Sequence, residues 1–274
     1  MTGQVAQNLS VACGSNPNVL RPIPGYGDIT RLENTANSNY NALQFSGRRA
    51  VGSLNLSVAY TYAHSIDNSS DRFDGNFVDS YNLDRTRASS NFDQRHIFTI
   101  SYLYNLPFFR KPGVTHTVLG GWEVSGVTTI QTGTPFSVTN GTDFADAAGV
   151  ANGVGTGSFA DIVGDPHSGF VRNVGDEGPR LYNPDAYAAP QGLTFGDSGR
   201  NSLVNPRRTN FDVSLFKHFP IKESYAFEFR WDAFNIFNHT QFSAIDNSLG
   251  SATFLEATSA HAARIMQFGA KFIF

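Results

Sequence analysis

Apolar and polar residues alternate along most of this chain with a period of two, the pattern of β-strands whose two faces meet different environments. Segment 264–274 shows the alternation clearly. Its apolar face consists of Met266, Phe268, Ala270, Phe272 and Phe274, and its polar face of Gln267, Gly269 and Lys271. The apolar face continues to the terminal carboxylate, although chain termini usually fray into water. This ending indicates a strand that is covered on one face, either by a protein core or by lipid.

Six further segments carry strand patterning: about 40–47, 54–63, 95–106, 119–132, 209–219 and 224 to about 238. All twelve prolines lie outside the seven segments, as sheet ladders require of a residue without an N–H group. The alternation breaks at 234–237, which predicts a β-bulge. The apolar faces are almost free of charge. Lys217 is the exception, and it is close enough to a strand end to extend its ammonium group into the interface.

The connections between these segments alternate strictly in length. The short ones are 48–53, 107–118 and 220–223, and the long ones are 64–93, 133–208 and 239–263. Outer-membrane barrels have short periplasmic turns, long extracellular loops and aromatic residues at both interfaces. We expect one rim at Tyr104, Trp122, Phe219, Tyr225 and Phe274, and the other at Tyr62 and Phe211. The pattern predicts an all-β fold, an antiparallel transmembrane β-barrel segment with long extracellular loops.

Composition agrees with strands and turns. The 274 residues include 24 Phe, 10 Tyr and 26 Gly, which favours sheets over helices. No run approaches the ~18 apolar residues of a transmembrane helix. A net charge of −3 gives no basis for nucleic-acid binding. The single cysteine, Cys13, excludes an internal disulfide and a cysteine-based zinc site.

The sequence contains no signature of catalysis or of a cofactor. The glycine run 153–157 lacks the spacing and the lysine of a phosphate-binding loop. Segment 67–75 is rich in carboxylates but lacks the spacing and the closing Glu of an EF-hand, so a solvated loop is favoured over calcium. His96 is expected at the membrane interface rather than in a metal site. Segment 182–187, in a long loop, is a candidate for ligand contact or for loop packing. We expect no enzymatic activity, no cofactor and no metal.

Several motifs resemble the C-terminal barrel of TonB-dependent outer-membrane receptors, in particular the Oar-like branch. They are SNYNALQ (38–44), YTYAHSID (60–67), FDQRHIF (92–98), GWEVSG (121–126), QTGTPF (131–136), NFDVSLFK (210–217) and FRWDAFNIFNH (229–239). The resemblance extends in order over about 38–274. It implies a plugged barrel of 22 strands that binds or takes up a ligand with energy passed on by TonB. It also implies contact with outer-membrane lipid and with the barrel-assembly machinery.

The resemblance and the alternation together define the expected domains and site residues. Residues 1–37 are expected to be an irregular loop region on the extracellular side, and 38–274 the last seven or so strands of a larger barrel. The expected C-terminal assembly signal comprises Met266, Phe268, Phe272 and Phe274. The candidate lumen-lining charges are Arg95, Glu123, Asp212, Glu228, Arg230, Asp232 and Lys271.

Two alternatives remain open from the sequence. One is a small self-contained or oligomeric outer-membrane barrel or adhesin. The other is a soluble β-sandwich carbohydrate-binding module, in which the aromatic residues of the segment from 224 to about 238 would form the core. Residues 1–10 have neither the basic nor the apolar region of a signal peptide. The first strand also has an edge without a partner, which a bilayer does not tolerate. Both observations favour the interpretation of the chain as a receptor fragment.

Overall fold

The computed structural model describes residues 23, 34–71, 82–111, 113–140, 158–170, 172, 178–190, 195–222 and 225–274. Most of the expected 1–37 region therefore lies outside the described residues, as do Cys13, the glycine run 153–157 and the second half of the 67–75 segment.

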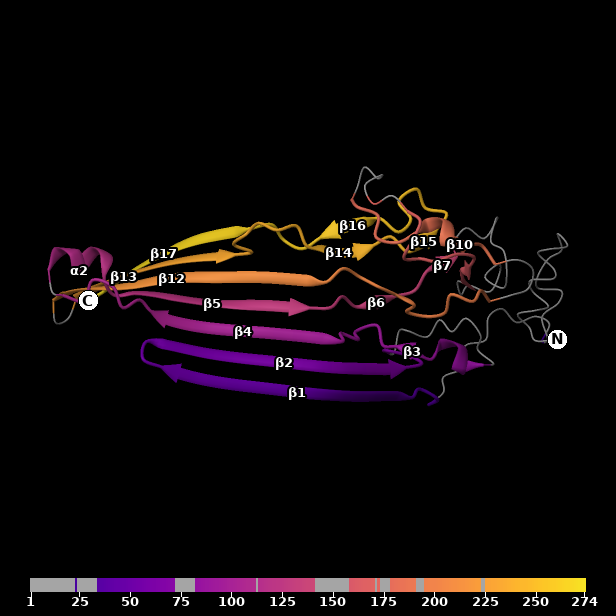
Figure 1. Cartoon of the computed structure of the whole chain (residues 1–274), viewed down its shortest axis with the longest axis horizontal. Coiled ribbons are helices and arrows are strands. Elements are labelled where there is room, and N and C mark those ends of the chain that lie inside the picture. The colour runs from indigo at the N-terminus through magenta and orange to yellow at the C-terminus, as the bar shows by residue number, and fades with distance from the viewer. Residues whose placement is uncertain are drawn as a thin grey trace.

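One large antiparallel sheet runs the length of the molecule (Figure 1). Its seven long strands lie side by side in sequence order. They are β1 (Ser38–Val51), β2 (Leu54–Asp67), β4 (His96–Asn105), β5 (Trp122–Gln131), β12 (Arg208–Lys222), β13 (Tyr225–Phe234) and β17 (Ile265–Ile273). The short strand β3 (Ala88–Ser89) adds to the end of β2. Because each long strand pairs with its neighbour along the chain, short turns collect at one end of the sheet and long loops at the other. The predicted all-β fold is confirmed.

The register between strands separates a polar face from an apolar face. Residues directly opposite one another in an antiparallel pair share a face. On the polar face, Ser57 pairs with Ser101, and Ser214 pairs with Asp232. On the apolar face, Phe227 pairs with Phe272, and many of the large side chains there are exposed: Phe268 is 72% exposed and Phe45 63%. The sheet therefore turns a broad aromatic surface outward.

The sheet curls around its polar face. A cavity of about 690 Å³ is lined by residues of six neighbouring strands, from Arg48 of β1 to Phe234 of β13. Ser57, Ser101 and Ser214 of the polar face lie along it. The polar face is thus the inner wall of a trough, which we call the polar trough, and the aromatic face is its outer wall.

Strands β1 and β17 form the two edges of this sheet. Within the described residues, each of them pairs with one neighbour, β1 with β2 and β17 with β13. All of β1 except Gly47 is exposed, as is β17 from Ile265 to Phe272. Each edge therefore presents a row of backbone N–H and C=O groups along its outer side.

Three expectations about the strands need correction. The predicted bulge at 234–237 is wrong: β13 ends at Phe234, and Asn235 and Asn238 turn the chain with left-handed φ angles of 51°. Strand β12 does not stop before Pro220 but continues to Lys222, with a register shift between Pro220 and Lys222. At Pro220 the ladder with β5 has already ended. The missing N–H group of proline therefore costs no hydrogen bond to β5.

The third correction concerns the short connection before β5. Leu119 is not in a strand but in a one-and-a-half-turn helix, α2 (Val114–Leu119). Among the described residues, the other helical turns are the 3₁₀ segments η2 (Leu83–Thr86) and η4 (Pro184–Ala186). Within the described ranges, no helix has the length and apolar composition that a transmembrane helix requires.

The long loops fold together into a second body, the loop cap, formed by the described parts of 133–207 and 239–263 (Figure 1). Its short strands are β6 (Pro135–Phe136), β7 (Thr139–Asn140), β8 (Ser158–Phe159), β9 (Asp161–Ile162), β10 (Tyr187–Ala188), β11 (Leu203–Val204), β14 (Phe242–Ile245), β15 (Ser248–Leu249) and β16 (Ala257–Ala260). Strand β15 runs parallel to β7 and joins the two loops. The buried core of the cap consists of Val138, Ala160, Ala186, Tyr187, Leu203, Ile245, Phe254 and Leu255.

Gly126 provides a test of the packing of the outer wall. A Cβ atom at this position would lie 2.5 Å from Tyr102 Oη and 2.7 Å from the Asp212 carbonyl oxygen. We expect Gly126→Ala to lower the free energy of unfolding by about 1–3 kcal/mol, the usual cost of overpacking. The measurement is urea unfolding of the folded chain in lipid vesicles.

Gly269→Ala is the matched control, because the nearest atom to a Cβ there is Arg230 Cβ, 3.8 Å away. Equal losses of stability in the two variants would contradict the close packing of Tyr102 over Gly126.

Candidate functional site: the polar trough and the loop cap

Six of the seven candidate lumen-lining charges lie on the polar face of the sheet. They are Glu123 of β5, Asp212 of β12, Glu228, Arg230 and Asp232 of β13, and Lys271 of β17. Glu228 lies directly opposite Lys271 in the register. Glu123, Glu228, Arg230 and Lys271 line one cavity of about 430 Å³. The structure therefore brings four of these charges together near the short-turn end of the polar trough.

Hydrogen bonds across neighbouring strands compensate the carboxylates of the trough. Asp232 is almost fully buried and accepts hydrogen bonds from Ser214 Oγ at 2.5 Å, Arg230 Nε at 2.8 Å and Gln267 Nε2 at 3.0 Å. These four residues come from β12, β13 and β17. The polar face is consequently tied together by side chains as well as by the backbone ladder.

The other carboxylates have fewer partners. Asp212 accepts from Asn210 Nδ2 at 2.8 Å and from the Asn235 N–H at 2.9 Å, which fixes the chain where β13 ends. Glu228 lies 3.3 Å from His218 Nδ1. These contacts give Asp212 a structural role at the rim and leave Glu228 on the wall of the smaller cavity.

Arg95 lies apart from the other six charges. It precedes β4 at the long-loop end of the sheet, where its Nε donates to Asp93 Oδ2 at 2.8 Å. Asp93 is buried and also accepts from the Ser65 N–H, while His64 Nδ1 lies 3.0 Å from its Oδ2. Arg95 therefore stabilises the rim of the trough, at the start of the first long loop.

His96 and the tyrosines beside it form an aromatic group at the same rim. Tyr62 is opposite His96 in the register, and their ring centroids are 5.1 Å apart. Tyr60 Oη lies 2.8 Å from His96 Nδ1. His96 thus lies on the apolar face at the start of β4, with aromatic neighbours. Within the described residues, no group of three or more His, Cys, Asp or Glu side chains forms a potential metal site.

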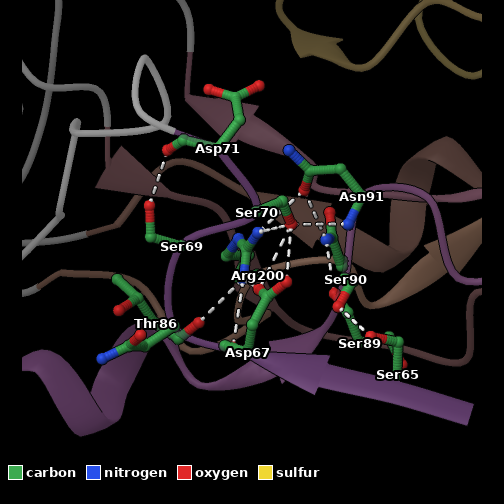
Figure 2. Close-up of polar contacts among 12 residues, drawn as sticks. Ser65, Asp67, Ser69, Ser70, Asp71, Thr86, Ser89, Ser90, Asn91 and Arg200 are labelled. Carbon is green, nitrogen blue, oxygen red and sulfur yellow. Dashed lines mark hydrogen bonds and ion pairs between the residues drawn. The ribbon is translucent and has the colours of Figure 1, made fainter. Parts of the chain in front are cut away.

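A buried ion pair between Asp67 and Arg200 connects the sheet with the loop cap (Figure 2). Asp67 is the last residue of β2, and Arg200 lies in the second long loop. Arg200 Nη1 donates to Asp67 Oδ1 at 2.7 Å, and the two side chains are 8% and 2% exposed.

The second arm of the Arg200 guanidinium group reaches further into the first long loop. Arg200 Nη2 donates to Ser70 Oγ at 2.7 Å and to Asn91 Oδ1 at 2.9 Å, as Figure 2 shows. Nη1 also donates to the Thr86 carbonyl oxygen at 3.3 Å. One planar cation thus connects both ends of the first long loop with the second, which suits the fixed fork of arginine donors. We call these residues the Arg200 cluster: Asp67, Ser70, Thr86, Asn91 and Arg200.

A second set of contacts joins the second and third long loops. Arg180 Nη2 donates to Glu256 Oε1 at 2.7 Å, and the Glu256 side chain is buried. Asn247 Nδ2 donates to the Ser137 carbonyl oxygen at 2.7 Å. Burial disfavours the Asp246 carboxylate, but hydrogen bonds from Ser251, the Ser248 N–H and Thr253 hold its pKa below the usual value. All three long loops are therefore connected into one body.

The two tyrosines of segment 182–187 are used for packing in the loop cap. Burial raises the pKa of Tyr187 to about 12, and its ring packs edge-on against Phe254. Tyr182 Oη donates to the Val204 carbonyl oxygen at 2.6 Å, and burial raises its pKa as well. Segment 182–187 was a candidate for ligand contact or for loop packing, and these two side chains pack within the loop cap.

The residues of the expected C-terminal assembly signal lie on the outer wall. Met266, Phe268 and Phe272 project from the apolar face of β17, and Phe274 follows the strand with 89% exposure. The Phe272 ring stacks on Tyr225 at 6.1 Å and on Phe274 at 6.3 Å. These rings form a continuous aromatic strip at the edge and at the short-turn end of the sheet.

The sequence did not indicate the Arg200 cluster. Asp67 belongs to the YTYAHSID motif and to a carboxylate-rich loop, and Arg200 lies 133 residues away. The available signal was the position of Asp67 at the end of a strand with strict alternation, where a buried charge needs a partner from a loop.

A curled antiparallel sheet with an aromatic outer wall, a polar inner wall, short turns at one end and long folded loops at the other defines the wall of a transmembrane β-barrel. The comparison with protein families agrees. The model described as outer membrane beta barrel domain matches residues 2–267, and the chain belongs to this family. No curated protein and no solved structure matches the chain.

This membership has two consequences. The protein is located in the outer membrane, as expected, and the soluble β-sandwich alternative is wrong. The aromatic outer wall therefore faces lipid, the short turns face the periplasm and the loop cap lies on the extracellular side.

The Arg200 cluster predicts a specific weakness of the loop cap. Arg200→Met leaves the Asp67 carboxylate buried without its cation, which typically costs about 3–5 kcal/mol. We expect the extracellular loops to become much more sensitive to protease added to intact cells, while the strands remain protected. The measurement is the rate of cleavage within 133–207.

Two further variants serve as controls. Arg110→Met removes an exposed arginine at the short-turn end and should leave the cleavage rate unchanged. Asp67→Leu combined with Arg200→Met should lose less stability than Arg200→Met alone, because no buried charge remains unpaired. A double variant as labile as the single one would show that the ion pair does not hold the loops.

Proposed function

We propose that this chain forms part of the barrel wall and the ligand-facing extracellular loops of a TonB-dependent outer-membrane receptor of the Oar-like kind. The observation that carries the proposal is the loop cap. A simple structural barrel needs no folded body outside the membrane, whereas a receptor needs a fixed surface for its ligand. The buried core of the cap and the Arg200 cluster provide such a fixed surface.

The open edges of the sheet support a larger barrel. A bilayer does not tolerate unpaired backbone groups in its hydrocarbon region. Both β1 and β17 present such groups, so in the membrane each pairs with a strand other than those described. In the proposed receptor these strands belong to the same barrel, whose expected total is 22.

The proposal gives the polar trough a role as well. Glu123, Glu228, Arg230 and Lys271 carry charges of both signs on the inner wall. Such a surface suits a polar plug domain held by complementary charge pairs. TonB would act through that plug, and the barrel-assembly machinery would recognise the C-terminal residues Met266, Phe268, Phe272 and Phe274. The proposed partners also include outer-membrane lipid and an unidentified ligand; neither nucleic-acid binding nor enzymatic activity is proposed.

A second candidate function follows from the same open edges. Edge β1 of one copy can pair with edge β17 of another, which would close a barrel by oligomerisation. In that case the protein would be an oligomeric outer-membrane barrel or adhesin, without a plug and without TonB.

Fractionation of the source cells separates the two candidates. An antibody against the tail Phe268–Phe274 is used on boiled and unboiled outer-membrane samples. For a receptor we expect a heat-modifiable band several times larger than 29.8 kDa, the mass of the present chain. We also expect this band to be co-isolated with the periplasmic domain of TonB.

The other outcomes contradict the receptor proposal. An unboiled oligomer that falls to 29.8 kDa on boiling, and that TonB does not retain, would establish the oligomeric barrel. A large single-chain band that TonB fails to retain would mean a larger barrel of another function.

A further inference from the structure

The short connection between β4 and β5 presents an unusual amount of apolar surface. This foot segment, residues 107–121, contains helix α2. Five of its apolar side chains are each more than half exposed: Phe108, Phe109, Val114, Val118 and Leu119. The segment lies at the short-turn, periplasmic end of the sheet (Figure 1). A patch of this kind on an ordinary surface turn would be unfavourable in water.

The contacts of α2 place the foot segment toward the lipid side of the wall rather than over the polar trough. The indole Nε1 of Trp122 donates to the Val118 carbonyl oxygen at 3.2 Å. The ammonium group of Lys217 donates to the same oxygen at 3.2 Å and to the Gly120 carbonyl oxygen. Trp122 and Lys217 are opposite each other in the register and belong to the outer, lipid-facing wall. The C-terminal end of α2 therefore lies against that wall.

Lys217 explains how the end of α2 is held there. Its side chain is 2% exposed, and its Nζ lies 4.7 Å from the centroid of Phe219 and 5.3 Å from that of Trp122. A buried cation in this position needs the two carbonyl oxygens, which are left unpaired by the helix end. Lys217 thus acts as a positioning residue for the foot segment.

The foot segment also carries positive charge without a balancing acid. Arg110 and Lys111 are exposed, and residues 107–121 contain no Asp or Glu. The three short connections together hold five Lys or Arg residues and one acid, Glu223. The periplasmic leaflet presents phosphate groups next to its acyl chains. Apolar and basic side chains in one short segment match this boundary.

We infer that the foot segment is an interfacial anchor for anionic phospholipid. Its exposed apolar side chains insert into the periplasmic leaflet of the outer membrane, continuous with the lipid-facing wall at Trp122. Arg110 and Lys111 bind the phosphate of a lipid headgroup. This role concerns the barrel wall itself and is independent of TonB.

The depth of the foot segment tests the insertion. Val114→Cys, in a Cys13→Ser background, is labelled with an environment-sensitive fluorophore. The folded, heat-modifiable protein is then reconstituted in vesicles of phosphatidylcholine and phosphatidylglycerol. We expect quenching by acrylamide to be several-fold weaker at position 114 than at Val163→Cys, an exposed valine of the loop cap. Equal quenching at both positions would overturn the inference.

A protein partner is the other occupant that this experiment detects. If the label at position 114 is protected in outer-membrane vesicles but not in pure lipid vesicles, a protein covers the foot segment and the lipid anchor is wrong. Lys217→Met should expose the label while heat-modifiable mobility is retained, and Lys217→Arg should restore part of the protection. If acrylamide quenching of the label is unchanged in Lys217→Met, Lys217 does not position the foot segment.

Lipid selectivity tests the headgroup site. Trp231→Phe leaves Trp122 as the only tryptophan, and energy transfer is measured to pyrene-labelled phosphatidylglycerol or phosphatidylcholine. A basic residue near an anionic surface contributes roughly a fivefold preference, and salt screens it. We expect a preference for phosphatidylglycerol at low salt that Arg110→Gln with Lys111→Gln abolishes.

The matched control is Arg48→Gln with Arg49→Gln, which removes two cations near the β1–β2 turn, outside the foot segment. This variant should keep the preference. If both double variants lose the preference for phosphatidylglycerol equally, the preference comes from diffuse charge. If the parent protein shows no such preference, it has no headgroup site. Either result would overturn the inference.

Discussion

The structure depends on one constraint: backbone N–H and C=O groups in a bilayer must be hydrogen-bonded within the protein. The sequential antiparallel order from β1 to β17 satisfies it for every strand except at the two outer edges. Because side chains alternate across a strand, the same ladder that pairs the backbone also sorts side chains into a lipid-facing wall and a polar trough. Within the described residues, the outer sides of β1 and β17 are the two places in the sheet where this requirement is not met.

The two ends of the sheet follow different rules, since they lie in different surroundings. The loop cap lies in water and is built like a small soluble domain, with its own core around Leu255 and Val138. It needs attachment to the sheet, and the Asp67–Arg200 ion pair provides it in a buried position where a lost partner is costly. The periplasmic end lies at a lipid boundary. There Trp122 and Lys217 donate hydrogen bonds to the Val118 carbonyl oxygen of α2, a short helix with an apolar surface.

The sequence predicted what depends on local periodicity and missed what depends on partners far away. All seven strands were found, because lipid on one side enforces a period of two. The end of β13 was missed, since the break in alternation at 234–237 predicted a bulge within the strand, whereas Asn235 and Asn238 turn the backbone. Helix α2 was missed because six residues are too few for a helical period. The Arg200 cluster joins residues 133 positions apart, a separation that no local pattern encodes.

Lys217 shows why a charge on the lipid-facing wall does not contradict the membrane assignment. The ladder between β5 and β12 runs over ten pairs, from Arg208 to Lys217. At about 3.3 Å per residue this length is roughly 30 Å, and a tilt of about 40° reduces its height to roughly 23 Å. That height is close to the apolar band of an outer-membrane barrel, about 25 Å. Lys217 therefore lies near the periplasmic boundary of the band, where its ammonium group reaches the carbonyl oxygens of the foot segment. Phe219, Phe227 and Phe272 continue the outer wall beyond it as an aromatic rim.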